Sequence, residues 1–290
     1  MSDSINKRMI LVPIDFTDIT IVALDQAVNL AKVIGAEITL INVSEDHGLF
    51  NKYISNSEAD EHKKEVERNL EALGNDRSSS GITFHTMTAH GKIYEKINEV
   101  AEMINATLIL MGTSGSLGIM KFIGSNTLRV IRESKIPVIS IKGKNIDPGL
   151  SSILLPLDLS KETREKVSKA IWLSHLYGNA RVDIVSINTS SDSFIKSKIK
   201  RQDHQVQTFL QSKGIDTTLK IINDRKGKSI AECILGYATV VNAGIIMIMT
   251  QQESNITKMF IGSSAQAIIN GSEIPVMSVI PGVHKYDVTF

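Results

Sequence analysis

Residues Thr107–Lys142 read TLILMGTSGSLGIMKFIGSNTLRVIRESKIPVISIK and contain two short apolar runs, Leu108–Met111 and Val138–Ile141. Each run is too short for an isolated helix and is bounded by glycine or proline, so both are predicted to be buried strands. Between them, a glycine-bearing loop leads into a helix that starts near Gly124. The order strand, loop, helix, strand is typical of a parallel α/β unit.

The loop in this stretch is suited to binding an anion through its backbone. Gly112 and Gly115 can adopt positive φ and allow a ligand to approach the main chain closely. Gly124 and Ser125 lie where the first N–H groups of a helix lack partners, and the positive end of the helix dipole favours phosphate. The alternative is that Gly112 simply ends a strand and that Ser125 or Asn126 is an ordinary helix N-cap.

The chain contains two copies of one sequence pattern. MILVPIDFTD in the first half returns as SILLPLDLSK in the second, which places Asp15 opposite Asp158. Near the end of each half, FIGSNTLRVIRESKIPVISI matches FIGSSAQAIINGSEIPVMSV, with Gly124 opposite Gly262. Each copy is long enough to fold alone, so the repeat predicts two tandem domains. The predicted domains are residues 1–145 and 151–290.

Each copy alternates strands with helices, which predicts a parallel sheet covered by helices on both faces. The fold class is therefore α/β, with two tandem doubly wound five-stranded domains of Rossmann-like type. In the first copy, strands are expected at 9–14, 37–43, 82–87, 108–111 and 138–141, and helices at 19–34, 58–73, 92–104 and from 124. In the second copy, strands are expected at 153–157, 181–187, 217–222, 245–249 and 276–280, and helices at 161–177, 194–213, 229–242 and from 263.

Composition limits the kind of protein. The formal net charge of +1 gives no overall argument for nucleic acid or an anionic membrane as a partner. The single cysteine, Cys233, excludes an intrachain disulfide and favours a reducing compartment. The first residues predict neither a signal peptide nor a membrane span. We therefore expect a soluble, cytoplasmic protein.

A ligand site is expected at the carboxyl ends of the strands, where the strand order of a doubly wound sheet reverses. If the first and fourth strands are neighbours, the loop carrying Asp15 faces the loop that follows Met111. Asp15 could then accept a hydrogen bond from a ribose or an adenine amine. The alternative is that Asp15 caps a helix or turn beside Thr17. Pro13 removes a ladder donor, which predicts a fixed distortion at the strand end.

The combination of ILVPIDFTD, MGTSG and GSNT leading into KIPVISI resembles the universal stress protein family, UspA-like, in its tandem two-domain form. The resemblance covers about residues 9–142 and 152–280. It implies binding of an adenine nucleotide, ATP or AMP, and allows for magnesium with ATP. It also implies that a nucleoside is surrounded by Pro13, Asp15 and Val43 and that phosphates are held by Met111, Gly112, Gly115, Gly124, Ser125 and Asn126.

The second copy departs further from the family motif. Aligning on Gly262 places Thr250 opposite Gly112 and Glu253 opposite Gly115. In this alignment the second copy lacks two conformationally permissive glycines and has a carboxylate beside the expected phosphates. Nucleotide binding by the second copy is therefore predicted to be weaker. We therefore expect one competent nucleotide site, in the first domain.

Three functions remain open on these residues. The first is an adenine-nucleotide-binding regulatory protein in the stress response. The second is a stress scaffold without a nucleotide, acting through protein contacts; it is favoured because the loop between Gly115 and Gly124 has eight positions where the family motif has nine. The third is a slow ATPase, which is weaker because only Asp15 is an evident general base.

The remaining expectations concern partners and metals. No catalytic residue, metal site, nucleic acid or membrane partner is expected. The resemblance implies that the two domains pair through their last strands, Val138–Ile141 and Val276–Ile280, inside one chain, with a homodimer left open.

Overall fold

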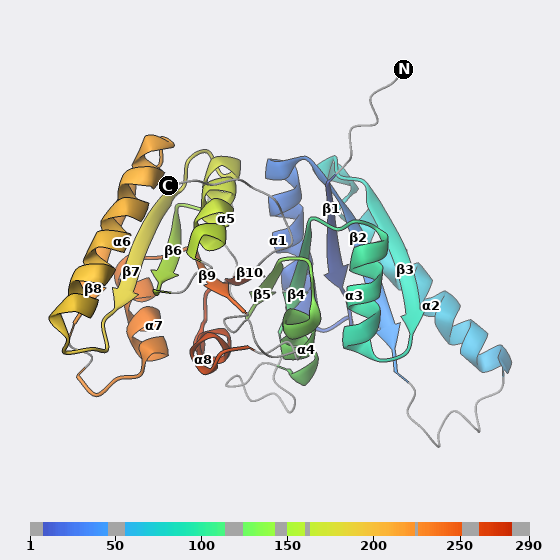
Figure 1. Cartoon of the computed structure of the whole chain (residues 1–290). Coiled ribbons are helices and arrows are strands. Elements are labelled where there is room, and N and C mark those ends of the chain that lie inside the picture. The colour runs from blue at the N-terminus through green and yellow to red at the C-terminus, as the bar shows by residue number, and fades with distance from the viewer. Residues whose placement is uncertain are drawn as a thin grey trace. The chain divides into compact units, whose positions relative to one another are not determined.

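The computed structural model describes residues 8–45, 56–113, 124–142, 150–159, 163–223, 226–250 and 261–279. They form two compact units, each a sheet with helices packed against it (Figure 1). Among the helices described, none is long and apolar enough to cross a membrane.

The first unit alternates strands and helices as the sequence predicts. Its strands are parallel and lie in the order β3-β2-β1-β4-β5. Its elements are β1 (Arg8–Pro13), α1 (Asp18–Ile34), β2 (Ala36–Ser44), α2 (Asn56–Asn75), a 3₁₀-helix (Ser78–Ser80), β3 (Phe84–His90), α3 (Ile93–Met103), β4 (Leu108–Gly112), α4 (Ser125–Glu133) and β5 (Val138–Ile141).

The second unit repeats this topology, with strand order β8-β7-β6-β9-β10 and parallel pairing. The doubly wound fold class is therefore confirmed for both copies. Its elements are β6 (Ser152–Leu157), α5 (Thr163–Leu176), β7 (Arg181–Ile187), α6 (Ser193–Ser212), β8 (Thr217–Ile222), α7 (Ile230–Val240), β9 (Ile245–Met249), α8 (Ser263–Gly271) and β10 (Val276–Val279).

The central strands β1 and β4 are buried because helices cover both faces of the sheet. Right-handed crossovers place α1 and α2 on one face and α3 and α4 on the other, and α3 contacts α4. Ile10, Leu11 and Val12 of β1 are fully buried, as are Leu108 and Ile109 of β4. This explains why both strands read as continuous apolar runs rather than as alternating patterns.

One strand begins later than the sequence predicts. The apolar pattern places the third strand at Ile82–Met87, whereas β3 begins at Phe84. The 3₁₀-helix comes just before it and is followed by Gly81, which has the left-handed conformation with φ of 74°. The turn ends at Gly81, and residues 82 and 83 lead from it into the strand.

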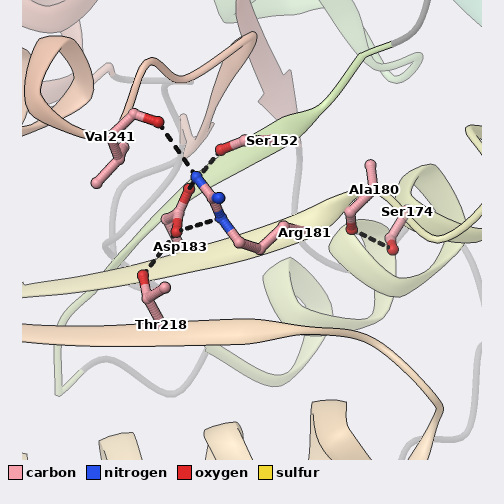
Figure 2. A network of polar contacts seen from close by, with 7 residues as sticks. All are labelled: Ser152, Ser174, Ala180, Arg181, Asp183, Thr218 and Val241. Atoms are coloured by element: carbon pink, nitrogen blue, oxygen red, sulfur yellow. Dashed lines mark hydrogen bonds and ion pairs between the residues drawn. The ribbon is translucent and has the colours of Figure 1, made fainter.

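A buried carboxylate joins three strands of the second unit near their amino ends. Asp183 of β7 has no exposed surface, and its Oδ1 accepts hydrogen bonds from Thr218 Oγ1 (2.6 Å) and Arg181 Nε (2.9 Å). Its Oδ2 accepts from Ser152 Oγ and Arg181 Nη2, which also donates to Val241 O (Figure 2). Four donated bonds compensate the buried charge and tie β6, β7 and β8 together.

Candidate functional site

The strand order of the first unit reverses between β1 and β4. Ile10 pairs with Leu108 and Leu11 with Ile109, both in parallel register. The loops that follow these strands therefore leave the same edge of the sheet, as expected for a site at the switch point. Since α4 runs antiparallel to β4 and β5, its amino end lies at this edge too.

Asp15 lies in the loop after β1 and is exposed. Its Oδ1 accepts hydrogen bonds from the Thr17 N–H (3.0 Å), Thr17 Oγ1 (2.5 Å) and Thr20 Oγ1 (3.0 Å). These bonds fix the turn into α1, so the turn-capping interpretation of Asp15 describes its geometry here. Its second oxygen, Oδ2, accepts no hydrogen bond from the part of the chain that the structure describes. One carboxylate oxygen thus orders the loop.

Two further predicted nucleoside residues border this loop. Pro13 ends β1 and pairs with Ile41 in regular register, and the Ile14 N–H donates to Ile41 O (2.8 Å). The expected distortion at the strand end is therefore not visible in the pairing. Val43 is half-buried on β2, two residues beyond Ile41 and thus past the last paired residue of β1.

Gly112 allows helix α1 to approach the end of β4. A Cβ at this position would lie 2.5 Å from Ile19 O and 3.0 Å from Thr20 N, both in the backbone of α1. Gly112 is not among the glycines with positive φ. Glycine is required at position 112 because of close backbone packing and not, as predicted, because of left-handed geometry.

Replacing Gly112 by alanine is expected to destabilise the first unit by about 1–3 kcal/mol, because backbone rather than a mobile side chain must yield. The measurement is chemical denaturation followed by far-ultraviolet circular dichroism. Gly236→Ala is the matched control, since a Cβ in that helix meets nothing within 4 Å. Equal unfolding midpoints for Gly112→Ala and the wild type would contradict this packing role.

Met111 and Thr113 flank Gly112, and both are buried. Met111 of β4 is only 5% exposed, so its side chain belongs to the core. Thr113 donates its N–H (2.9 Å) and its Oγ1 (3.0 Å) to Ile141 O. The sequence analysis did not single out Thr113. A threonine directly after an apolar strand indicates a side chain that can bond to the end of a neighbouring strand.

Helix α4 begins without a side-chain cap. Gly124 is the N-cap residue, with φ of −56° and ψ of 144°, so the interpretation of Ser125 or Asn126 as N-cap is wrong. Ser125 is exposed and Asn126 is half-buried in the first turn. The amino end of α4 therefore offers backbone N–H groups and the helix dipole at the switch-point edge. Gly115, the remaining predicted phosphate residue, lies outside the described residues.

Strand pairing corrects the match between the two copies. Gly112 is the last residue of β4 and pairs with Ile141, whereas Met249 is the last residue of β9 and pairs with Val279. Met249 therefore stands where the first copy has Gly112, and the alignment of Thr250 with Gly112 is wrong. Glu253, which that alignment placed opposite Gly115, lies outside the described residues.

In the second unit, side chains donate hydrogen bonds to backbone carbonyl oxygens at the end of β6 and just after it. The buried Lys166 donates from Nζ to Pro156 O (2.7 Å). Gln202 Nε2 (2.5 Å) and Thr163 Oγ1 (3.1 Å) both donate to Asp158 O. In the repeat, Lys166 corresponds to an alanine of the first copy, so the two strand ends differ in chemistry as well as in the glycine loop.

A metal centre has no support in the residues that the structure describes. They contain no group of three or more histidine, cysteine, aspartate or glutamate side chains placed to hold a metal ion.

Comparisons with known proteins agree with this architecture. The family model for the universal stress protein family matches residues 7–142 and 150–279. Universal stress protein MJ0531 of Methanocaldococcus jannaschii is 31% identical over 139 residues, 47% of this chain and 82% of that protein. Universal stress protein YxiE of Bacillus subtilis is 28% identical over 143 residues, 46% of this chain and 97% of that protein.

A solved structure matches over nearly the whole length. The crystal structure of a universal stress protein from Archaeoglobus fulgidus has a TM-score of 0.76 at 19% identity, covering 96% of this chain and 98% of that one. This likeness concerns the fold. The family match spans both copies, and each copy has the same five-stranded topology. The chain therefore belongs to the universal stress protein family and carries two of its domains in tandem.

Proposed function

We propose that the first domain binds an adenine nucleotide, ATP or AMP, and that this binding regulates the protein in a stress response. The observation that carries the proposal is the convergence of Asp15, Gly112 and the uncapped start of α4 at the switch-point edge of one sheet. A carboxylate that can accept from a ribose and a helix end that favours phosphate are the two groups a nucleotide requires.

The proposed roles follow the chemistry of each group. Asp15 Oδ2 accepts from the ribose or the adenine amine, between Pro13 and Val43. The backbone N–H groups of the first turn of α4 hold the phosphates. The proposed phosphate residues are Met111, Gly112, Gly115, Gly124, Ser125 and Asn126, with magnesium accompanying ATP.

We assign the nucleotide to the first domain because the second differs from it at two places. Met249 puts a buried side chain where the first domain has a glycine. Lys166 and Gln202 already donate to the carbonyls at the end of β6. Each carbonyl oxygen that accepts a hydrogen bond within the protein has less capacity left to accept one from a nucleoside.

The experiment is isothermal titration calorimetry of nucleotide-stripped protein with ATP and magnesium, and then with AMP. Gly124→Glu and Gly262→Glu form a matched pair, because both glycines are N-caps with φ of −56° and nearly equal ψ. We expect about one site per chain, lost in Gly124→Glu because a carboxylate repels the phosphates, and retained in Gly262→Glu.

Two results would count against the proposal. Two sites per chain would show that the second domain also binds. No heat at millimolar ATP would leave the second candidate function, a nucleotide-free scaffold, which the short loop before Gly124 favours. Slow ATP hydrolysis is the weaker candidate, and phosphate release during the same incubation measures it.

The cellular location and the oligomeric state are proposed from the sequence. A single cysteine, Cys233, fits the reducing cytoplasm. The expected internal domain pairing and the alternative homodimer stay predictions. Light scattering of the purified protein distinguishes one chain from two.

A further inference from the structure

Helix α6 carries a group of cations that lack carboxylate partners. Lys196, Lys198, Lys200 and Arg201 are exposed and lie within six residues; we call them the α6 cluster. None of the four has an ion pair with any residue that the structure describes. The only carboxylate of α6 is Asp203, which is buried and accepts from Ser186 Oγ (2.9 Å). Apart from the exposed N-cap carboxylate of Asp192, no exposed carboxylate of the helix offsets the positive charge of the cluster.

An exposed aromatic ring lies on the same side of the helix. Phe194 is 64% exposed, and its spacing of four and seven residues from Lys198 and Arg201 places the three on one face. The opposite face, with Ile199 and Val206 buried, packs against β7 and β8 (Figure 1). Since that face supplies the core contacts, the outward face is not required for folding.

We propose that α6 binds an anionic phospholipid surface through Lys198, Arg201 and Phe194 of its outward face, with the exposed Lys196 and Lys200 of the α6 cluster adding positive charge from the flank of the helix. A helix surface is convex, and long lysine and arginine side chains on it adapt to charges that move. Lipid headgroups are laterally mobile and can gather under such a cluster, and clusters of four or more basic residues on a helix are typical of anionic-lipid binding. Phenylalanine is suited to the boundary between headgroups and acyl chains.

The net charge of the whole chain does not reveal the local positive charge of this surface. The net charge of +1 led to the expectation of no membrane partner. Residues 192–222, however, contain six lysines and arginines and three aspartates, of which Asp203 is buried. Binding to a surface depends on local rather than total charge, because screening limits each charge to about one Debye length of roughly 10 Å.

The test is co-sedimentation with phosphatidylcholine vesicles that contain either no phosphatidylserine or about one third of it. We expect binding to the anionic vesicles only, and its loss at high salt. The double variant Lys198→Glu and Arg201→Glu changes the local charge by four units, so the affinity falls by roughly a hundredfold or more. Phe194→Ala lowers it by roughly tenfold.

A matched control separates the cluster from the net charge. Lys32→Glu with Lys64→Glu makes the same change in net charge at exposed positions of α1 and α2, and vesicle binding is expected to remain. Circular dichroism of each variant verifies folding.

Three results of the vesicle experiment overturn the proposal. They are no sedimentation of the wild type with anionic vesicles, equal binding by the α6 variant, and equal loss in the control. Binding of a single-stranded oligonucleotide in place of vesicles would assign the surface to nucleic acid and also overturn it. The test uses no nucleotide, so it is independent of the function proposed for the first domain.

Discussion

Replacing Asp183 by alanine is expected to lower the free energy of unfolding of the second domain by about 3–5 kcal/mol. The carboxylate is fully buried and is the shared acceptor for Ser152, Thr218 and Arg181. Its removal leaves hydroxyl donors without their partner and a guanidinium without its counter-charge. Leaving buried polar groups unpaired costs more than the net contribution of the bonds themselves.

The single tryptophan makes this measurement specific to one domain. Trp172 lies in α5 of the second unit, so its fluorescence during urea denaturation follows that unit. Asp216→Ala removes an exposed aspartate just before β8 and is the control, with a change within about 0.5 kcal/mol. An Asp183→Ala midpoint equal to that of the wild type would show that the network does not stabilise the sheet.

The second large effect is a dependence of stability on pH that originates at Asp203. This residue lies on the buried face of α6, and its Oδ2 is buried without a hydrogen-bond partner among the described residues. Burial raises the pKa of the Asp203 carboxyl from 3.8 to about 6, although the Ser186 hydrogen bond and the neighbouring His204 act in the opposite direction.

The sign follows from proton binding. Between pH 4 and 6 the folded state binds more protons at Asp203 than the unfolded state, so stability falls as the pH rises through this window. The rise of the Asp203 pKa from 3.8 to about 6 corresponds to about 3 kcal/mol of destabilisation at pH 7 relative to pH below 4. Replacing the Asp203 carboxyl by a neutral group removes this pH-dependent contribution to the free energy of unfolding.

The measurement compares wild type and Asp203→Asn by urea denaturation of the Trp172 signal at a series of pH values. The difference in unfolding free energy between the two proteins is expected to change by up to about 3 kcal/mol across pH 4–7. Asp216→Asn, at an exposed position, serves as the control. A difference that stays constant with pH would exclude Asp203 as the titrating group.

The fold could be predicted because local and global signals agree in this chain. Short apolar runs bounded by glycine or proline marked β4 and β5, and the repeat supplied the same plan twice. The strand ends β1 and β4 became neighbours as the switch-point rule requires. Gly124, the N-cap of α4, is recognisable from the sequence because glycine and helix periodicity are both local signals.

The match of Thr250 with Gly112 failed because strand register is a tertiary property. Counting from Gly262 assumes equal loops, but the segment 250–262 is one residue longer than 113–124. Since β4 and β9 are both apolar, their sequences do not reveal a shift of one residue. The register becomes visible only in the hydrogen bonds to β5 and β10.

The polar core residues were also missed, for a related reason. Asp183 stands within an apolar strand, and Asp203 stands between Ile199 and Val206 on a helical apolar face. A carboxylate at a core position indicates a buried polar network. The hydrogen-bond partners of that carboxylate cannot be recognised from the sequence, because Thr218 is 35 residues from Asp183. At the register position of Asp183, the first sheet has a threonine, so the repeat gives no guidance either.

Hydrogen–deuterium exchange of the whole chain with and without ATP tests most directly the claim that the first domain is the nucleotide site. We expect ATP to slow exchange in the loop around Asp15 and in the first turn of α4 after Gly124. The corresponding segments around Asp158 and Gly262 are expected to exchange at unchanged rates. Equal protection of both domains, or protection of the second alone, would contradict the account.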